Sequence, residues 1–261
     1  MSIIVFESVD KVFRQRGLFW LRKRGAETQA LKRLSLAVSR GEVLGLLGPN
    51  GSGKSTTLKL ISTMLLPDRG EVLVHGFDTC RHGNEVRRNV GFAVASERSF
   101  FPRLTVRENL EFFAALENVR RRDVRDRVES VLSCVSLNDV AGKQVMKLSS
   151  GMYQRLGIAR AMIKKPAVLL LDEPTRSLDA AAADELWRLI QNLSMAGTTV
   201  LLATHNFEEA AAVCDRVALL KEGELMTIQK ARNFAAQELR DFYLEMTNDS
   251  VTEKLRIGVP A

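Results

Sequence analysis

Four short, nearly unbroken runs of apolar side chains recur along the sequence. They cover residues 43–47, 90–95, 168–171 and 199–203. Runs of this length, without alternating polar residues, are typical of strands buried on both faces of a parallel sheet. Polar residues that directly follow such strands would lie at the edge where open α/β sheets bind ligands. The pattern therefore predicts an α/β fold with its chemistry at the strand ends.

Apolar residues spaced three or four positions apart predict helices between these strands. Residues 56–65 carry Leu58, Ile61 and Leu65, and Pro67 ends the pattern. Residues from about 98 to 150 are predicted to form helices. Their apolar stripes comprise Leu104, Val106, Leu110, Phe113 and Leu116, followed by Val124, Val128, Val131 and Val135. Near the C-terminus, Gly223 marks a hairpin-like turn.

Composition places the chain among ordinary globular proteins. It has 261 residues, of which 46% are apolar and 26% charged, so we expect one or two domains. The three cysteines lie far apart, which argues against a metal site or a disulfide framework and fits a reducing cytosol. No apolar run approaches the ~18 residues of a membrane span. The first residues are too acidic for a secretory signal. We therefore expect a cytosolic protein without a membrane domain of its own.

Positive charge is concentrated near the N-terminus. The net charge is +7, and residues 1–40 hold nine basic side chains against three acidic ones. Most of this excess lies in residues 14–25, a basic and aromatic segment. It could contact anionic lipid or nucleic acid, or it could form a solvated surface loop. A second basic run, residues 120–127, is interpreted as a solvated helix face.

The strongest chemical signal is a glycine-rich loop between a predicted strand and a predicted helix. It follows the pattern G-x-x-x-x-G-K-S, in which glycines let backbone N–H groups turn toward phosphate oxygens. Lys54 supplies a positive charge for the β- and γ-phosphates, and Ser55 offers a hydroxyl to Mg²⁺. The helix N-terminus adds a favourable dipole. The predicted nucleotide-binding residues are Gly48, Pro49, Asn50, Gly51, Ser52, Gly53, Lys54, Ser55 and Thr56.

Two carboxylates follow the strand at residues 168–171. Asp172 would hold Mg²⁺, and Glu173 would orient the attacking water or accept its proton. His205 follows the strand at residues 199–203, where its imidazole could link a γ-phosphate to Glu173. The predicted catalytic residues are therefore Glu173, His205 and Lys54. A phosphate loop alone would also fit kinases and GTPases.

One further motif narrows the class of protein. The sequence LSSGM at residues 148–152 resembles the LSGGQ signature of ATP-binding cassette (ABC) ATPases, and QRLGIARA resembles the helix that follows it. The order of phosphate loop, signature, LLLDEPT, SLD and ATH also resembles that family over roughly residues 3–225. Ser150 and Met152 depart from the signature, while Ser149 and Gly151 match it.

The resemblance implies further features. It implies an α/β P-loop NTPase (RecA-like) core with an antiparallel β subdomain and an inserted ABC α-helical subdomain. It implies head-to-tail dimers in which Ser149 and Gly151 meet the γ-phosphate at the partner's Lys54 and Asp179 reaches across. Phe13 would stack on adenine, unless it is a core aromatic. The helical subdomain would dock a membrane subunit, with Phe100 and Phe101 exposed at that seam. Residues 239–247 resemble the C-terminal helix of type-2 ABC exporters.

The sequence departs from the family where a glutamine usually follows the strand at residues 90–95. Counting from Gly91 places Ala95 there, and counting back from Pro102 places Ser96. The following Ser-Glu resembles a loop variant of some ABC exporters. Ser96 and Glu97 together could replace the glutamine, with Glu97, which has the reach of glutamine, on the metal side with Ser55 and Asp172. Alternatively, Glu97 pairs with Arg98 or another basic residue on the surface.

These features predict the ATPase subunit of an ABC exporter on the cytoplasmic face of the membrane. The ATPase domain would span residues 1–225, with its core at about 1–92 and 160–225, a helical subdomain at about 98–159 and a C-terminal extension at 226–261. It would use ATP and Mg²⁺, dimerise, most simply with itself, and pair with a separate transmembrane permease. No stable nucleic-acid partner is expected. The alternatives are a soluble ABC ATPase acting on nucleic acid, ribosomes or an assembly complex, and a small-molecule phosphotransferase.

Overall fold

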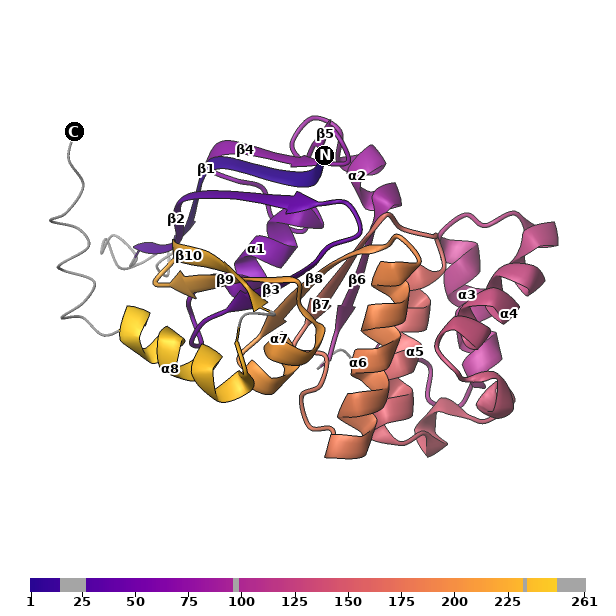
Figure 1. Cartoon of the computed structure of the whole chain (residues 1–261). Helices are drawn as coiled ribbons and strands as arrows, with labels where there is room; N and C mark the ends of the chain where they lie inside the picture. Colours follow the sequence, from indigo (N-terminus) through magenta and orange to yellow (C-terminus); the bar gives the residue numbers. More distant parts are fainter. Residues whose placement is uncertain (15–26, 96–98, 232–233, 248–261) are drawn as a thin grey trace, which may run out of the picture.

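The computed structural model describes residues 1–14, 27–95, 99–231 and 234–247. Most of the basic segment at residues 14–25, the predicted sensor residues Ser96 and Glu97, and the tail from residue 248 lie outside these described residues. Two sheets and a group of helices make up the described part (Figure 1). The observed architecture is the predicted α/β class.

A six-stranded sheet forms the centre, in the order β10-β9-β3-β8-β7-β6. All neighbouring strands are parallel except β10 and β9, which are antiparallel. The predicted apolar runs form three inner strands, β3, β8 and β7, and the edge strand β6. The bounds are β3 Val43–Leu47, β6 Val90–Val94, β7 Val168–Asp172, β8 Thr199–Thr204, β9 Arg216–Lys221 and β10 Glu224–Lys230.

Alternate residues of the parallel strands face two separate hydrophobic cores, which explains why the runs are apolar throughout. Leu46, Leu170 and Ala203 belong to one core, and Leu47 and Leu171 belong to the other. The first core contains α1, Lys54–Ile61, and the antiparallel sheet. The second contains most of the other helices. Successive strand side chains point to opposite faces, so burial on both faces needs an unbroken apolar run.

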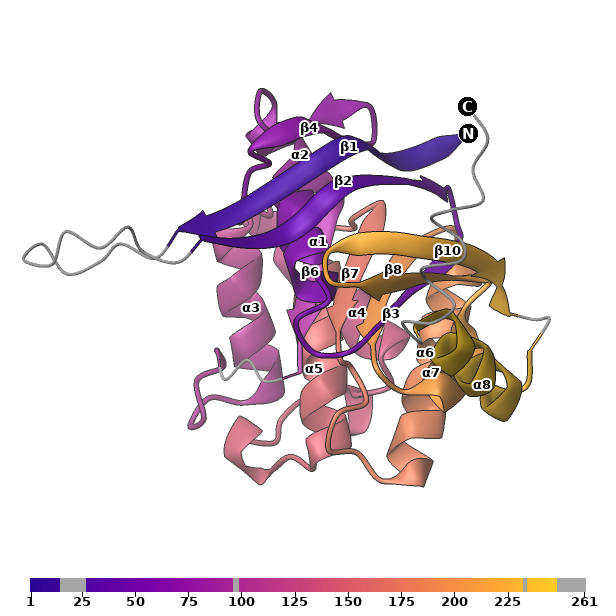
Figure 2. The same ribbon diagram turned by 90° about the vertical axis from the view of Figure 1, so that its left-hand side faces the viewer.

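The second sheet is antiparallel and has the order β2-β1-β4-β5. It lies on the α1 side of the central sheet, as the two views in Figures 1 and 2 show. Its strands are β1 Ser2–Arg14, β2 Glu27–Ser39, β4 Arg69–Val74 and β5 Phe77–Asp78. The short helix α2, Gly83–Asn89, leads from it to β6.

The helical subdomain packs beside β6 and β7 (Figure 1). It contains α3 Val106–Leu116, α4 Val124–Cys134 and α5 Ser150–Met162. Thr105 and Glu108 form a capping box that starts α3. The predicted apolar stripe that runs from Leu104 to Leu116 is only partly correct, since these two end residues are exposed. The prediction that Phe100 is exposed is also wrong: it is buried and stacks edge-on against Phe113 and Tyr153, whereas Phe101 is exposed.

The remaining helices flank the sheet and continue toward the C-terminus. They are α6 Ala180–Met195, α7 Phe207–Val213 and α8 Ala236–Thr247. Helices α7 and α8 pack together, with Phe207 against Tyr243. Gly223 has φ +82° in the turn between β9 and β10, as the hairpin prediction requires. Because β10 pairs with β9 as far as Lys230, the sheet crosses the predicted domain boundary at residue 225.

Candidate active site

The glycine-rich loop connects β3 to α1 at the carboxyl end of the sheet. Gly53 has φ +106° and caps the helix, and an added Cβ would lie 2.8 Å from the carbonyl oxygen of Ala30. At Gly48, an added Cβ would lie 2.3 Å from the carbonyl oxygen of Leu220. The backbone therefore requires glycine at both positions. Pro49, Asn50 and Gly51 form the exposed tip of the loop, whereas Ser52 is buried and Thr56 is half-buried.

The ammonium group of Lys54 lies inside this loop. It donates hydrogen bonds to the carbonyl oxygens of Gly48 at 2.7 Å and Pro49 at 3.0 Å. Burial lowers the pKa of Lys54, while the charges of Glu173 and Asp172 oppose this effect. A partly desolvated cation at the first residue of a helix is suited to bind an anion.

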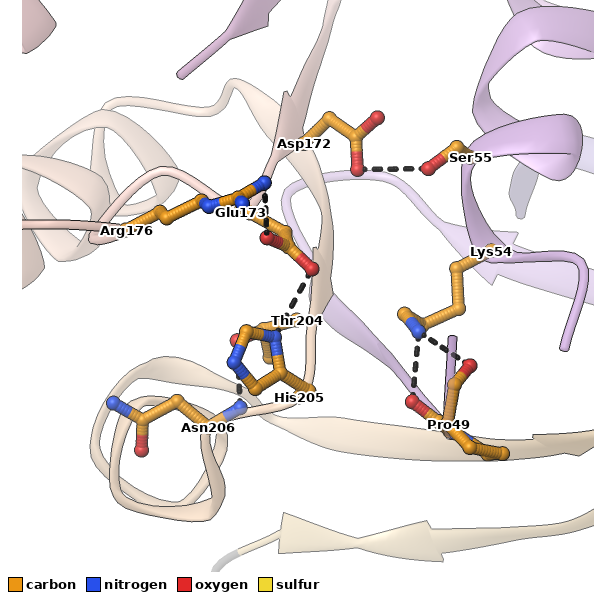
Figure 3. A network of polar contacts seen from close by, with 10 residues as sticks. Pro49, Lys54, Ser55, Asp172, Glu173, Arg176, Thr204, His205 and Asn206 are labelled. Carbon is orange, nitrogen blue, oxygen red and sulfur yellow. Dashed lines mark hydrogen bonds and ion pairs between the residues drawn. The ribbon is translucent and has the colours of Figure 1, made fainter. Parts of the chain in front are cut away.

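Ser55 and Asp172 meet between α1 and the end of β7 (Figure 3). The Ser55 hydroxyl donates to Asp172 Oδ1 at 3.1 Å. Burial raises the pKa of Asp172, and the neighbouring Glu173 charge adds to this. A hydroxyl and a carboxylate are hard oxygen ligands that suit Mg²⁺. A bound cation would also offset the energetic cost of burying the negative charge of Asp172. The described residues contain no group of three His, Cys, Asp or Glu that could hold a metal.

Glu173 and His205 are in contact, although they follow different strands. His205 Nδ1 lies 3.0 Å from Glu173 Oε1, and the Glu173 N–H donates to the Ala203 carbonyl. Glu173 has φ 50°, a left-handed backbone conformation that is unfavourable for residues other than glycine. Arg176 approaches the other oxygen at 3.5 Å, so the carboxylate lies between a histidine and an arginine (Figure 3).

The predicted signature and Asp179 lie at the starts of two neighbouring helices. Ser149 caps α5 by accepting a hydrogen bond from the Met152 N–H. Gly151 packs against α6, where an added Cβ would lie 3.0 Å from the Ala182 Cβ. The exposed Asp179 caps α6 through the Ala182 N–H at 2.8 Å. In a single chain these residues therefore have local structural roles, and their contacts across a dimer remain predictions.

Phe13 lies near the end of β1 and is 41% exposed, with the Lys11 ammonium 5.8 Å from its ring centroid. Its exposure rules out the alternative of a core aromatic. Its ring is available for stacking, and the adenine contact remains a prediction.

Glu97 lies outside the described residues. The N–H of Ala95, two positions before Glu97, donates to the carbonyl of Asp172 at 3.2 Å, which places Ala95 beside the proposed metal ligand.

Sequence reasoning missed two residues near Glu173. Arg176 lies three positions after Glu173. Its place as a charged residue in the turn after Pro174 could have indicated that it contacts Glu173. Glu209, on α7, is fully buried and carries the other overlooked carboxylate. Its neighbour Glu208 is exposed, so two adjacent glutamates gave no indication of which one points inward.

Comparison with known proteins gives consistent matches. The family model described as "ABC transporter" matches residues 31–176. A second model, described as an AAA domain with a putative AbiEii toxin of a type IV TA system, matches residues 144–210. The ABC transporter ATP-binding protein NatA of Bacillus subtilis is 36% identical over 76% of this chain and 80% of its own length. The daunorubicin resistance ATP-binding protein DrrA3 of Streptomyces coeruleorubidus is 38% identical over 82% of this chain and 68% of its own.

Solved structures share the fold. The dimeric post-hydrolysis state of the ATP-binding cassette MJ0796, bound to ADP and Pi, has a TM-score of 0.75 at 29% identity, covering 88% of this chain and all of that one. The cbiO1 protein of Clostridium perfringens, part of an ABC transporter complex, has a TM-score of 0.79 at 26% identity, covering 98% of this chain and 99% of that one.

Proposed function

Because the chain belongs to the ABC transporter family of ATP-binding subunits, we propose that it powers export of a substrate through a separate membrane subunit. As a member of this family it binds and hydrolyses ATP, and such subunits act as dimers together with membrane subunits. The direction of transport is inferred from relatives named for daunorubicin resistance and for Nod factor export. None of the helices in the described parts of the chain is long and apolar enough to cross a membrane.

Each site residue has a separate role in ATP hydrolysis. The loop amides and Lys54 bind the β- and γ-phosphates. Glu173 orients the attacking water or accepts its proton, because its carboxylate is held between His205 and Arg176. With Nδ1 of His205 directed at Glu173, Nε2 on the other edge of the ring is available to a phosphate oxygen. Mg²⁺, when held by Ser55 and Asp172, would neutralise phosphate charge. Positioning and electrostatics supply most of the catalysis.

The second active-site half would come from a second subunit. We infer that Ser149 and Gly151, at the N-terminus of α5, meet the γ-phosphate bound by the partner's loop. A helix N-terminus with small residues suits an anion. A homodimer is the simplest arrangement, and the subunits would lie on the cytoplasmic face of the membrane.

A groove of about 1080 Å³ supports docking of a membrane subunit. It opens between the core at α2 and β6 and the helical subdomain at α3 and α4. Its lining is strongly basic. The cationic side chains are Arg87, Arg88, Arg120, Arg127, Arg160 and Lys164, against the acidic Glu117 and Asp123. The Lys164 ammonium lies 3.4 Å from Glu117, whereas the described residues give Arg88 and Arg120 no ion pair. The groove thus favours an acidic segment of the membrane subunit.

We base the catalytic assignment on the contact between Glu173 and His205 beside the phosphate loop. The test is capture of tagged Glu173→Gln protein from detergent-solubilised native membranes with MgATP. The substitution removes the base and keeps its size, so an ATP-bound complex should accumulate. Recovery of one stoichiometric multi-span protein supports a transporter. Recovery of only ribosomes, nucleic acid or other non-membrane partners contradicts it.

The alternatives have less support. An ABC ATPase acting on nucleic acid would be expected to show salt-sensitive nucleic-acid binding. The similarity to transporter subunits over most of the chain favours transport instead. A small-molecule phosphotransferase does not account for the match to the ABC transporter family.

A further inference from the structure

Glu209 presents an unusual buried charge close to the active site. Its side chain is fully buried on α7, four residues after His205. Neither carboxylate oxygen has a hydrogen-bond partner among the described residues. Buried carboxylates are normally paired or hydrogen-bonded, because removing the charge from water is otherwise strongly unfavourable. The residue therefore requires an explanation beyond packing.

Three donors from three different elements lie beside this carboxylate. They are the hydroxyl of Thr204 at the end of β8, the hydroxyl of Thr175 in the turn after Glu173, and the indole N–H of Trp187 on α6. None reaches hydrogen-bond geometry, and within the described parts of the chain the buried Trp187 nitrogen has no hydrogen-bond partner either. The Thr204 hydroxyl accepts from the Asn206 N–H at 3.0 Å, so its proton remains available to donate.

Two of these elements adjoin the proposed catalytic residues Glu173 and His205, and the third is capped by Asp179. Thr204 precedes His205, Thr175 lies two positions after Glu173, and Trp187 belongs to the helix that Asp179 caps. Burial raises the pKa of Glu209. The neighbouring polar groups of Thr204, Thr175 and Trp187 oppose this rise, and the charge of His205 opposes it to a smaller extent. An apolar residue at this position would be expected to stabilise the fold. Groups that lower stability in this way are often retained for function.

We propose that Glu209 is a positioning residue for ATP hydrolysis. In the hydrolysing state it accepts hydrogen bonds from Thr204, Thr175 and Trp187, and so fixes His205 against Glu173. This rests on the proposed function of those two residues. Glu209 touches no substrate and acts only through its neighbours.

The experiment compares Glu209→Met, Glu209→Gln and the matched control Glu208→Met, in which the adjacent exposed glutamate is replaced. For Glu209→Met we expect Tm to rise by about 2–4 °C, while kcat for MgATP falls about tenfold or more and KM stays within about twofold. Glu209→Gln retains polar atoms that can bond these neighbours, so kcat should stay within about threefold of wild type. Glu208→Met should leave kcat and KM unchanged.

A double-mutant cycle tests whether Glu209 acts through Glu173. Adding Glu209→Met to Glu173→Gln should reduce the residual rate much less than it reduces the wild-type rate. An unchanged kcat in Glu209→Met overturns the proposal. So does a loss of activity that parallels a loss of stability, or failure of that variant to fold, because either would show a structural role. If wild-type protein hydrolyses no ATP, or Glu173→Gln is fully active, the proposed catalytic assignment itself has failed.

Discussion

His205 Nδ1 lies 3.0 Å from the carboxylate of Glu173, although 32 positions separate the two residues in the chain. The contact exists because β7 and β8 are parallel neighbours, with Asp172 opposite Ala203. The two side chains therefore emerge side by side where the strands end. Each can restrict the orientation of the other.

We expect His205→Ala to lower kcat for ATP by about 100-fold with little change in ATP affinity, since general-base and positioning contributions have about this size. His205→Gln keeps a polar group of similar reach and should lose less. Steady-state ATPase assays and binding of a fluorescent ATP analogue measure the two effects. A variant that loses ATP affinity with kcat unchanged would place His205 in ground-state binding instead.

Glu97 is predicted to replace the missing glutamine. Glu97→Ala should lower ATP turnover and leave ATP affinity nearly intact, because the side chain would act near the metal and the attacking water. Glu97→Gln restores the residue usual in the family and should stay active. Turnover of Glu97→Ala equal to that of wild type would show that Glu97 instead forms a surface pair.

The two loop glycines with positive φ should differ in their tolerance of alanine. Gly51→Ala faces open space and should cost about 1–2 kcal/mol for the left-handed backbone alone. Gly53→Ala adds a clash with the Ala30 carbonyl and the Leu31 side chain, so about 2–4 kcal/mol is expected. Urea unfolding of the two variants measures the difference. Equal free energies of unfolding would mean that β2 moves away at no penalty.

Asp179 has a local role that can be separated from its predicted dimer role. Asp179→Ala removes the cap of α6 and should lower the free energy of unfolding by about 1 kcal/mol. Asp179→Asn keeps a capping oxygen and should retain stability. Thr105→Ala, at the cap of α3, serves as a control for cap loss away from the site. If Asp179 also reaches a partner subunit, Asp179→Asn should weaken ATP-dependent dimerisation seen by size-exclusion chromatography.

Glu209 should make stability depend on pH. Burial raises its folded-state pKa above the unfolded value of about 4.3, so the folded protein binds more protons between the two values. Stability is therefore lost as pH rises through that window. The other groups beside it are His205 after β8, Thr204, Thr175, Trp187 and Cys214, whose thiol pKa is raised by burial.

Glu209→Gln lacks this titration. Its Tm should therefore exceed the wild-type Tm by an amount that grows as pH rises from about 4.5 and then levels off. Thermal unfolding followed by circular dichroism across pH gives the comparison. A constant difference in Tm at every pH would mean that Glu209 does not titrate differently in the folded protein.

The sequence by itself determined the parallel strands, the phosphate loop and the residues that follow each strand. An unbroken apolar run such as residues 43–47 suits burial on both faces, and glycine at residue 53 meets a local backbone requirement. The same local chemistry placed Lys54, Ser55, Asp172 and Glu173 at one edge of the sheet. These features depend on short-range pattern and on the geometry common to parallel sheets.

Only the tertiary structure decided which neighbours each side chain meets. Phe100 and Phe101 are adjacent and identical, yet one stacks inside the helical subdomain and the other faces outward. Glu208 and Glu209 differ in the same way on α7. Periodicity shows that one face of an element is buried, but the partner surface comes from segments far apart in the chain. The buried carboxylate of Glu209 lies beside Thr175 and Trp187 because α6, α7 and the turn after β7 pack together, which no local pattern records.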